Sequence, residues 1–129
     1  MKIILNNELE LSPISAMGGK RFVQGENRDT ISFTFPVDTS MDEIDAIFTE
    51  GNCESITIVE GENEYIHNGY VIRAELKREP IEVTPATESE AAVYENRVIV
   101  SMSQRTYAET QMAAMKAAID LLYMEDVEV

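Results

Sequence analysis

The stretch Thr30-Ile31-Ser32-Phe33-Thr34-Phe35 contains the clearest strand pattern in the chain. Ile31, Phe33 and Phe35 alternate with hydroxyl side chains, so one face of the segment is apolar and the other is polar. Such alternation is typical of a strand with one face against a core and one face in solvent. Residues 30–35 therefore predict a half-buried strand around which the fold is built.

A short helix is predicted directly after this strand, near residues 41–49. Ser40 and Glu43 have the spacing of a capping box, in which the two side chains satisfy free backbone N–H groups at a helix start. The apolar residues that follow recur at helical spacing and predict that the helix covers the sheet: Met41, Ile44, Ile47 and Phe48.

Further strands are predicted on both sides of this unit. An N-terminal hairpin turns at Asn6-Asn7, and a second hairpin turns in the acidic segment 60–63. The two glycines of Ser15 to Gly19 predict a loop before a short strand at 21–23. The strands of the two hairpins are predicted at residues 2–5, 8–11, 55–59 and 64–67.

Asn68-Gly69 is the strongest signal for a two-residue hairpin turn, because both residues tolerate positive φ. It predicts that residues 70–76 return antiparallel to the preceding strand. Val93 to Met102 again alternates and is predicted to pair with residues 70–76. The polar segment 84–90 between them is predicted to be an exposed loop.

These patterns define an α+β fold for a chain of 129 residues, a length that suits one core. We expect a mainly antiparallel sheet or a split β-barrel, with one short covering helix and a C-terminal helix. Residues 1–104 form the predicted β-rich domain. Residues 105–129 form the predicted C-terminal helix, packed on that domain or on a partner subunit.

The C-terminal helix, predicted from Thr106 to Met124, carries apolar residues at alternating intervals of four and three. Such spacing produces a seam along one side of a helix, although two heptads are few for a coiled coil. The helix is either an ordinary core-packing helix or a surface for self-association or partner binding. The candidate seam comprises Ala108, Met112, Met115, Ile119 and Leu122.

The chain is strongly acidic, with a formal net charge of −14. This charge disfavours nucleic acid and anionic membranes as partners. The basic cluster Lys20, Arg21 and Arg28 is too small to reverse that expectation. No Lys or Arg lies between Arg28 and Arg73, and the acidic residues there predict an anionic side of the fold: Asp42, Glu43, Asp45, Glu60, Glu62 and Glu64.

The chemistry available to the chain is limited. His67 is the sole histidine and Cys53 the sole cysteine, and the carboxylates lack the spacing of a known calcium site. Gly18-Gly19-Lys20 lacks the remaining residues of a phosphate loop. We therefore expect no enzyme activity, no catalytic, cofactor-binding or metal-binding residues, no cofactor and no small-molecule substrate. A reduced Cys53 and the absence of an N-terminal signal peptide predict a cytoplasmic protein.

Five segments resemble small proteins encoded in the prophage tail modules of Firmicutes: Arg21 to Asp29, the strand with Phe33 and Phe35, the predicted helix from Met41 to Phe48, His67 to Tyr70 and Ser103 to Glu109. The order of elements is also similar to the split β-barrel hub domains of phage tail tubes and baseplates. The resemblance implies a non-catalytic structural or assembly component of a tail or baseplate. Its partners would be copies of itself or other tail proteins, and it would be made in the cytoplasm and incorporated into a virion or phage-like particle.

The alternative function is a monomeric acidic regulator or inhibitor that binds a basic protein surface. It rests on the acidic side chains between Asp38 and Glu64. The two functions differ in oligomeric state, because an assembly component is expected to form a defined oligomer or a stable complex.

Overall fold

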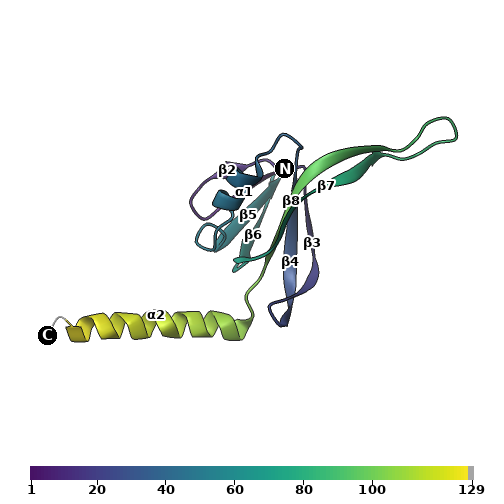
Figure 1. The fold of residues 1–129 in the computed structure, drawn as a ribbon. Coiled ribbons are helices and arrows are strands. Elements are labelled where there is room, and N and C mark those ends of the chain that lie inside the picture. Colours follow the sequence, from purple (N-terminus) through teal and green to yellow (C-terminus); the bar gives the residue numbers. More distant parts are fainter. Residues whose placement is uncertain (128–129) are drawn as a thin grey trace.

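The protein is described by a computed structural model that covers the backbone of residues 1–127 and the side chains of residues 1–121. It has the predicted α+β fold, with two antiparallel four-stranded sheets and two helices (Figure 1). The strands are β1 (Lys2–Ile4), β2 (Glu10–Leu11), β3 (Ser15–Val23), β4 (Glu26–Phe35), β5 (Ser55–Glu60), β6 (Asn63–Asn68), β7 (Ile72–Thr84) and β8 (Val93–Ser103). The helices are α1 (Met41–Ile47) and α2 (Tyr107–Val127).

The strands are divided between two sheets. One sheet has the order β2-β1-β5-β6 and the other has the order β3-β4-β8-β7. The two sheets are not closed into a barrel, so the barrel form of the prediction is not observed. Each sheet therefore keeps two edge strands, and the space between β3 and β6 stays open at one side of the core.

The core lies between the apolar faces of the two sheets and is completed by α1. Phe33 and Phe35 of β4 are buried as predicted, and their rings lie 5.7 and 6.1 Å from the ring of Phe48 at the end of α1. Ser40 caps α1 by accepting a hydrogen bond from the backbone N–H of Glu43 at 3.3 Å. Other buried residues are contributed by both sheets: Ile3, Ile56, Val98, Val100 and Met102.

Two sequence predictions are wrong. Residues 15–19 form the first half of β3 instead of a loop, because they pair in register with residues 30–34 of β4. Asn68-Gly69 is not a hairpin turn, since β6 and β7 belong to different sheets. Gly69 has the expected positive φ of 80°, but it carries the chain from one sheet to the other, and its N–H donates to the carbonyl of Glu54.

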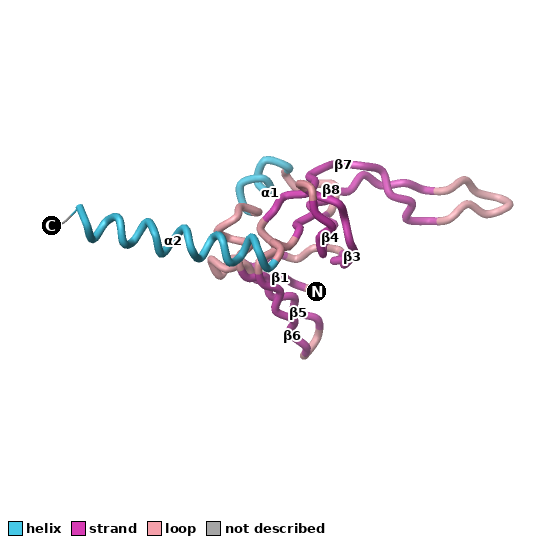
Figure 2. Tube along the Cα trace, turned by 90° about the horizontal axis from the view of Figure 1, so that it is seen from below, coloured by secondary structure: helices cyan, strands magenta, loops and turns pink. Residues whose placement is uncertain are grey.

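Strand β7 is longer than the sequence indicated, whereas β8 spans the predicted range and one residue more. They pair with each other as predicted, from Ile72 with Ser103 to Thr84 with Val93, whereas β4 pairs with β8 only from Val98 to Ser103. Residues 79–97 therefore continue beyond the sheet as a two-stranded projection, which we call the ribbon. The ribbon and α2 extend from opposite sides of the β-sheet body in both views (Figures 1 and 2).

Candidate assembly surfaces

Helix α2 starts at a capping box that fixes its first turn. The N–H of Glu109 donates to the Thr106 hydroxyl at 3.2 Å, and the N–H of Thr106 donates to the Glu109 carboxylate at 2.9 Å. Two free N–H groups of the helix start are satisfied in this way. The Thr-x-x-Glu spacing is visible in the sequence, so this motif was available to sequence analysis and was missed.

Arg28 joins this first turn to the β-sheet body. Its side chain is almost completely buried and donates to the carbonyl oxygens of Val23 at 2.8 Å and Gln104 at 3.2 Å. It also donates to both carboxylate oxygens of Glu109, at 3.1 Å for one of them. Bidentate pairs of this kind fix orientation as well as position. Arg28 is therefore an anchor for α2 and not part of a basic surface cluster with Lys20 and Arg21.

The ion pair changes the titration of both partners. The hydrogen bond from Arg28, followed by the one from the Thr106 N–H, lowers the pKa of Glu109 from 4.5 to about 2. The same hydrogen bond raises the pKa of Arg28 above its ordinary value. Both groups are therefore charged throughout the neutral and mildly acidic range, and the anchor persists there.

Beyond this first turn, α2 lies away from the body. Every described side chain from Thr110 to Leu121 is exposed, so α2 is not a core-packing helix of its own chain. The seam residues Met112, Met115 and Ile119 are 68, 62 and 60% exposed. Ala108 is also exposed, and the side chain of Leu122 lies outside the described residues.

The composition of α2 explains why it is helical and why burial of its surface against a partner would stabilise it. Alanine, methionine, glutamine and leucine have high helix propensity, and Lys116 and Asp120 are the charged residues between positions 110 and 121. Leu121, 63% exposed, lies on the other side of the helix from Ile119, so the apolar surface is not confined to one stripe. A helix that is apolar on most sides is normally buried, and isolated helices are marginally stable in water.

The ribbon is the second projecting element. Tyr94 and Glu82 face each other across its two strands, and the Tyr94 hydroxyl donates to the Glu82 carboxylate at 3.3 Å. Val83, Val93 and Tyr94 are exposed large hydrophobic residues. A two-stranded hairpin without a covered face is marginally stable in water, so the ribbon also has the character of a contact element.

The structure places the candidate acidic residues in two groups. Asp42, Glu43 and Asp45 belong to α1, and Asp45 accepts a hydrogen bond from Arg73 at 2.7 Å. The other three, Glu60, Glu62 and Glu64, are exposed around the turn between β5 and β6. Figure 2 shows α1 and this turn on different sides of the body, so the two groups do not form one continuous face.

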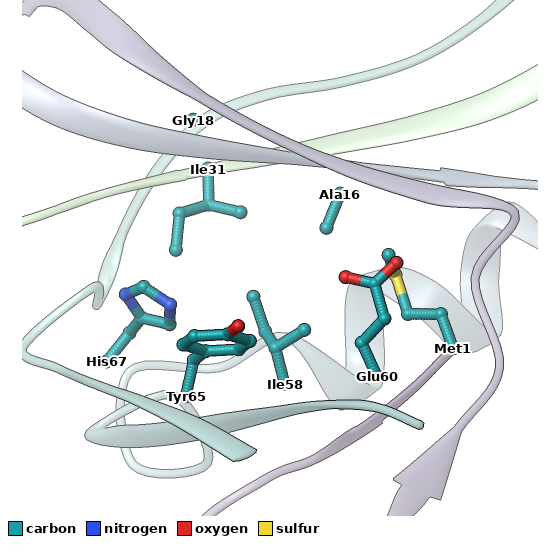
Figure 3. Close-up of a pocket in the computed structure, with 8 residues that line it drawn as sticks. All are labelled: Met1, Ala16, Gly18, Ile31, Ile58, Glu60, Tyr65 and His67. Atoms are coloured by element: carbon teal, nitrogen blue, oxygen red, sulfur yellow. The ribbon is translucent and has the colours of Figure 1, made fainter. Parts of the chain in front are cut away.

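A groove lies between the edges of the two sheets, beside the core. A mainly apolar hollow of about 260 Å³, lined also by Glu60, lies between β3 and β6. An adjoining hollow of about 380 Å³ shares Gly18, Ile31 and His67 with it. Figure 3 shows Ile31 and Ala16 on one side of the first hollow, with His67, Tyr65 and Ile58 pointing toward them from the other sheet. His67 is half-buried there, and its ring packs edge-on against Tyr70 at 5.7 Å.

Groups with reactive chemistry are few and dispersed. Cys53 is fully buried, and burial raises the pKa of its thiol to about 11, which disfavours the reactive thiolate. The described part of the chain holds no group of three or more His, Cys, Asp or Glu side chains arranged to bind a metal ion. Neither of its helices, over the described residues, has the length and hydropathy needed to span a membrane.

Comparisons with protein-family models, with curated protein sequences and with solved structures find no match to this chain. The class that the fold itself defines is an open two-sheet α+β domain with two projecting elements.

Proposed function

We propose that the protein is a non-catalytic structural or assembly component of a phage-like tail or baseplate, and that it acts through protein–protein contacts. The observation that carries the assembly part is the exposure of α2, which projects an apolar, weakly charged surface from an otherwise acidic body. The assignment to a tail or baseplate rests on the sequence resemblance. The same resemblance is the basis for proposing that the protein is made in the cytoplasm and incorporated into a virion or phage-like particle.

Helix α2 is suited to contact the same helix of another copy. Its seam residues are large and apolar, whereas the body carries most of the net charge of −14. Contact between two α2 helices buries apolar surface on both and keeps the acidic bodies outside the contact. Methionine side chains adapt to irregular neighbours, which suits a helix that packs against a copy of itself or another tail protein.

The anchor at Arg28 supports this role. A mobile helix would lose much conformational entropy on binding, whereas a helix held in one direction loses less. The capping box and the ion pair of Glu109 with Arg28 hold α2 in one direction before any contact forms. Preorganisation of this kind favours ordered assembly over nonspecific aggregation.

The test is the solution mass, measured by light scattering over a range of protein concentrations. The wild type is expected to form a discrete oligomer, and Ile119→Glu is expected to give a folded species of lower mass. Leu121→Glu is the matched control, because the two residues are equally exposed and lie about 200° apart around the helix. A wild type that is monomeric at every concentration would refute self-assembly through α2.

The monomeric acidic regulator is the weaker proposal. Its candidate acidic residues lie in two separate groups, and Asp45 is already paired with Arg73. The same light-scattering series distinguishes it, since a regulator is expected to be a monomer whose binding to a basic protein weakens with salt.

A further inference from the structure

A second contact surface lies along β3, the edge strand of its sheet. Among the described strands, β3 pairs with β4 alone, so one side of its backbone is free to accept another strand. The groove between β3 and β6 runs beside this edge (Figure 3). Exposed edges with an adjacent apolar hollow are the usual sites at which an extended segment of another chain adds to a sheet.

Gly18 and Gly19 keep this edge accessible. A Cβ atom built on either glycine meets nothing within 4 Å, and neither residue has a positive φ. The described part of the chain thus offers no packing or backbone reason for glycine at these positions. Glycine inside a strand weakens it and often marks the close approach of another backbone. Small residues alone do not identify the segment that binds at this edge. Its identity is inferred from the charged and apolar side chains around the two glycines.

The β3 edge carries basic and apolar side chains, and the groove beside it is also lined by the carboxylates of Glu60 and Asp29. Lys20 is 75% exposed at its side chain, and its nearest carboxylate partner, Asp29, is 3.7 Å away and also exposed, so this pair contributes little. Arg21 follows directly but lies on the outer face of the strand, away from the groove, where it is half-exposed and forms an ion pair with Glu75. Phe22, on the groove side, is 76% exposed, and Met17, on the outer side, is 70% exposed. A strand added at this edge would meet one basic residue on each face, Lys20 or Arg21, so the edge suits a segment that carries both glutamates and exposed apolar side chains.

The ribbon of this same chain has that composition. No Lys or Arg occurs from Glu79 to Asn96, whereas five glutamates do: Glu79, Glu82, Glu88, Glu90 and Glu95. Val83, Val93 and Tyr94 supply exposed apolar groups between these carboxylates. The ribbon points away from the body in both Figure 1 and Figure 2, so it is available to a different copy of the chain.

We propose that the ribbon of one copy docks along the β3 edge of a second copy. Its apolar side chains enter the groove beside Gly18, and its glutamates face Lys20 on the groove side of the strand and Arg21 on the outer side. This contact deepens the proposed assembly function, because it joins copies through a surface separate from α2. The contact is heterologous, since the ribbon and the β3 edge are different surfaces, and each copy therefore has one free ribbon and one free edge to continue the assembly.

The experiment uses the full chain with Ile119→Glu, which disrupts the α2 contact and so separates the two proposals. Isotope-labelled protein is followed by NMR from low concentration to about 1 mM, a range that detects weak association. Amide signals of residues 16–22 and of the ribbon are expected to shift together as concentration rises. Absence of shifts, or shifts in β3 without shifts in the ribbon, would overturn the proposal.

Two variants test the chemistry of the contact in the same background. Lys20→Glu is expected to reduce the concentration-dependent shifts, and combining it with Glu82→Lys is expected to restore them. Gly18→Val is expected to leave a folded spectrum, because a Cβ there has open space, and to abolish the shifts because it fills the groove. Shifts that persist unchanged in Lys20→Glu and Gly18→Val would exclude the β3 edge as the docking site.

Discussion

Arg28 connects three parts of the chain through one buried side chain. It donates to a carbonyl at the end of β3, to a carbonyl after β8 and to Glu109 in α2. Replacement by methionine keeps a flexible, unbranched side chain, shorter than that of arginine, and removes every donor. We expect Arg28→Met to lower the free energy of unfolding by at least about 1 kcal/mol, because buried acceptors then lack donors.

Urea unfolding measures this change. Arg78→Met is the matched control, since Arg78 is exposed and donates one hydrogen bond, to the carbonyl of Thr39 at 3.3 Å. The control is expected to stay within about 0.5 kcal/mol of wild type. Equal effects of the two substitutions would show that Arg28 does not anchor α2.

Glu109 makes the anchor sensitive to acid. Its pKa is lowered from 4.5 to about 2 by Arg28 and the Thr106 N–H, so the folded state binds its proton less tightly than the unfolded state does. A lowered pKa contributes stability that is fully present above about pH 4.5 and is lost as the pH falls toward 2. The difference in unfolding free energy between wild type and Glu109→Gln is therefore expected to be constant near neutral pH and to shrink below pH 4.5.

Urea titrations of both proteins at a series of pH values check this expectation. Circular dichroism of the same samples reports whether the helix content of α2 decreases together with the stability difference. A difference that stays constant down to pH 2 would mean that Glu109 is not paired in solution.

At the scale of elements, the ribbon is expected to be dispensable for folding of the body. Glu79 pairs with Arg97 across its base, and the buried part of β8 begins at the next residue, Val98. A chain in which residues 80–96 are replaced by Asn-Gly should close at this base with a two-residue turn. Its unfolding free energy is expected to stay within about 0.5 kcal/mol of wild type, because no buried apolar side chain is removed.

Urea unfolding of the shortened chain measures this quantity. The same protein, combined with Ile119→Glu, is expected to remain monomeric at all concentrations in light scattering. A large loss of stability would show instead that the ribbon packs against its own body.

How well an element can be predicted depends on how far apart in the sequence the residues that stabilise it lie. The strand at residues 30–35 and the start of α1 follow from side chains close in sequence, and both are observed. Residues 15–19 lack a local strand signal because of Gly18 and Gly19, and they form a strand because β4 supplies their hydrogen bonds. Asn68-Gly69 shows the converse, since a strong local turn signal does not reveal which sheet the next strand joins.

The candidate surfaces likewise divide into features visible in the local sequence and features that depend on residues distant in the sequence. The seam of α2 is a local pattern and is visible in the sequence, although its exposure is not. The partnership of Arg28 with Glu109 spans 81 residues and depends on where β3, β8 and α2 meet. The groove beside β3 depends on two sheets that remain open, which no local pattern in the chain reports.

At the scale of the whole molecule, the net charge of −14 opposes any approach of two copies, whichever surface they use. The two proposed contacts differ in what overcomes this repulsion. The α2 contact is apolar and brings few charges together, whereas the ribbon contact sets glutamates against Lys20 and Arg21. Salt screens both the general repulsion and the local attraction.

The two contacts are therefore expected to respond to salt in opposite directions. Raising the ionic strength from about 0.1 M to about 1 M shortens the screening length from about 10 Å to about 3 Å. Association through α2, isolated in Lys20→Glu, is expected to strengthen because screening removes repulsion between the acidic bodies. Association through the ribbon, isolated in Ile119→Glu, is expected to weaken because its attraction is lost. Sedimentation velocity of the two variants across this range measures both trends, and a common direction would mean that one contact accounts for all the assembly.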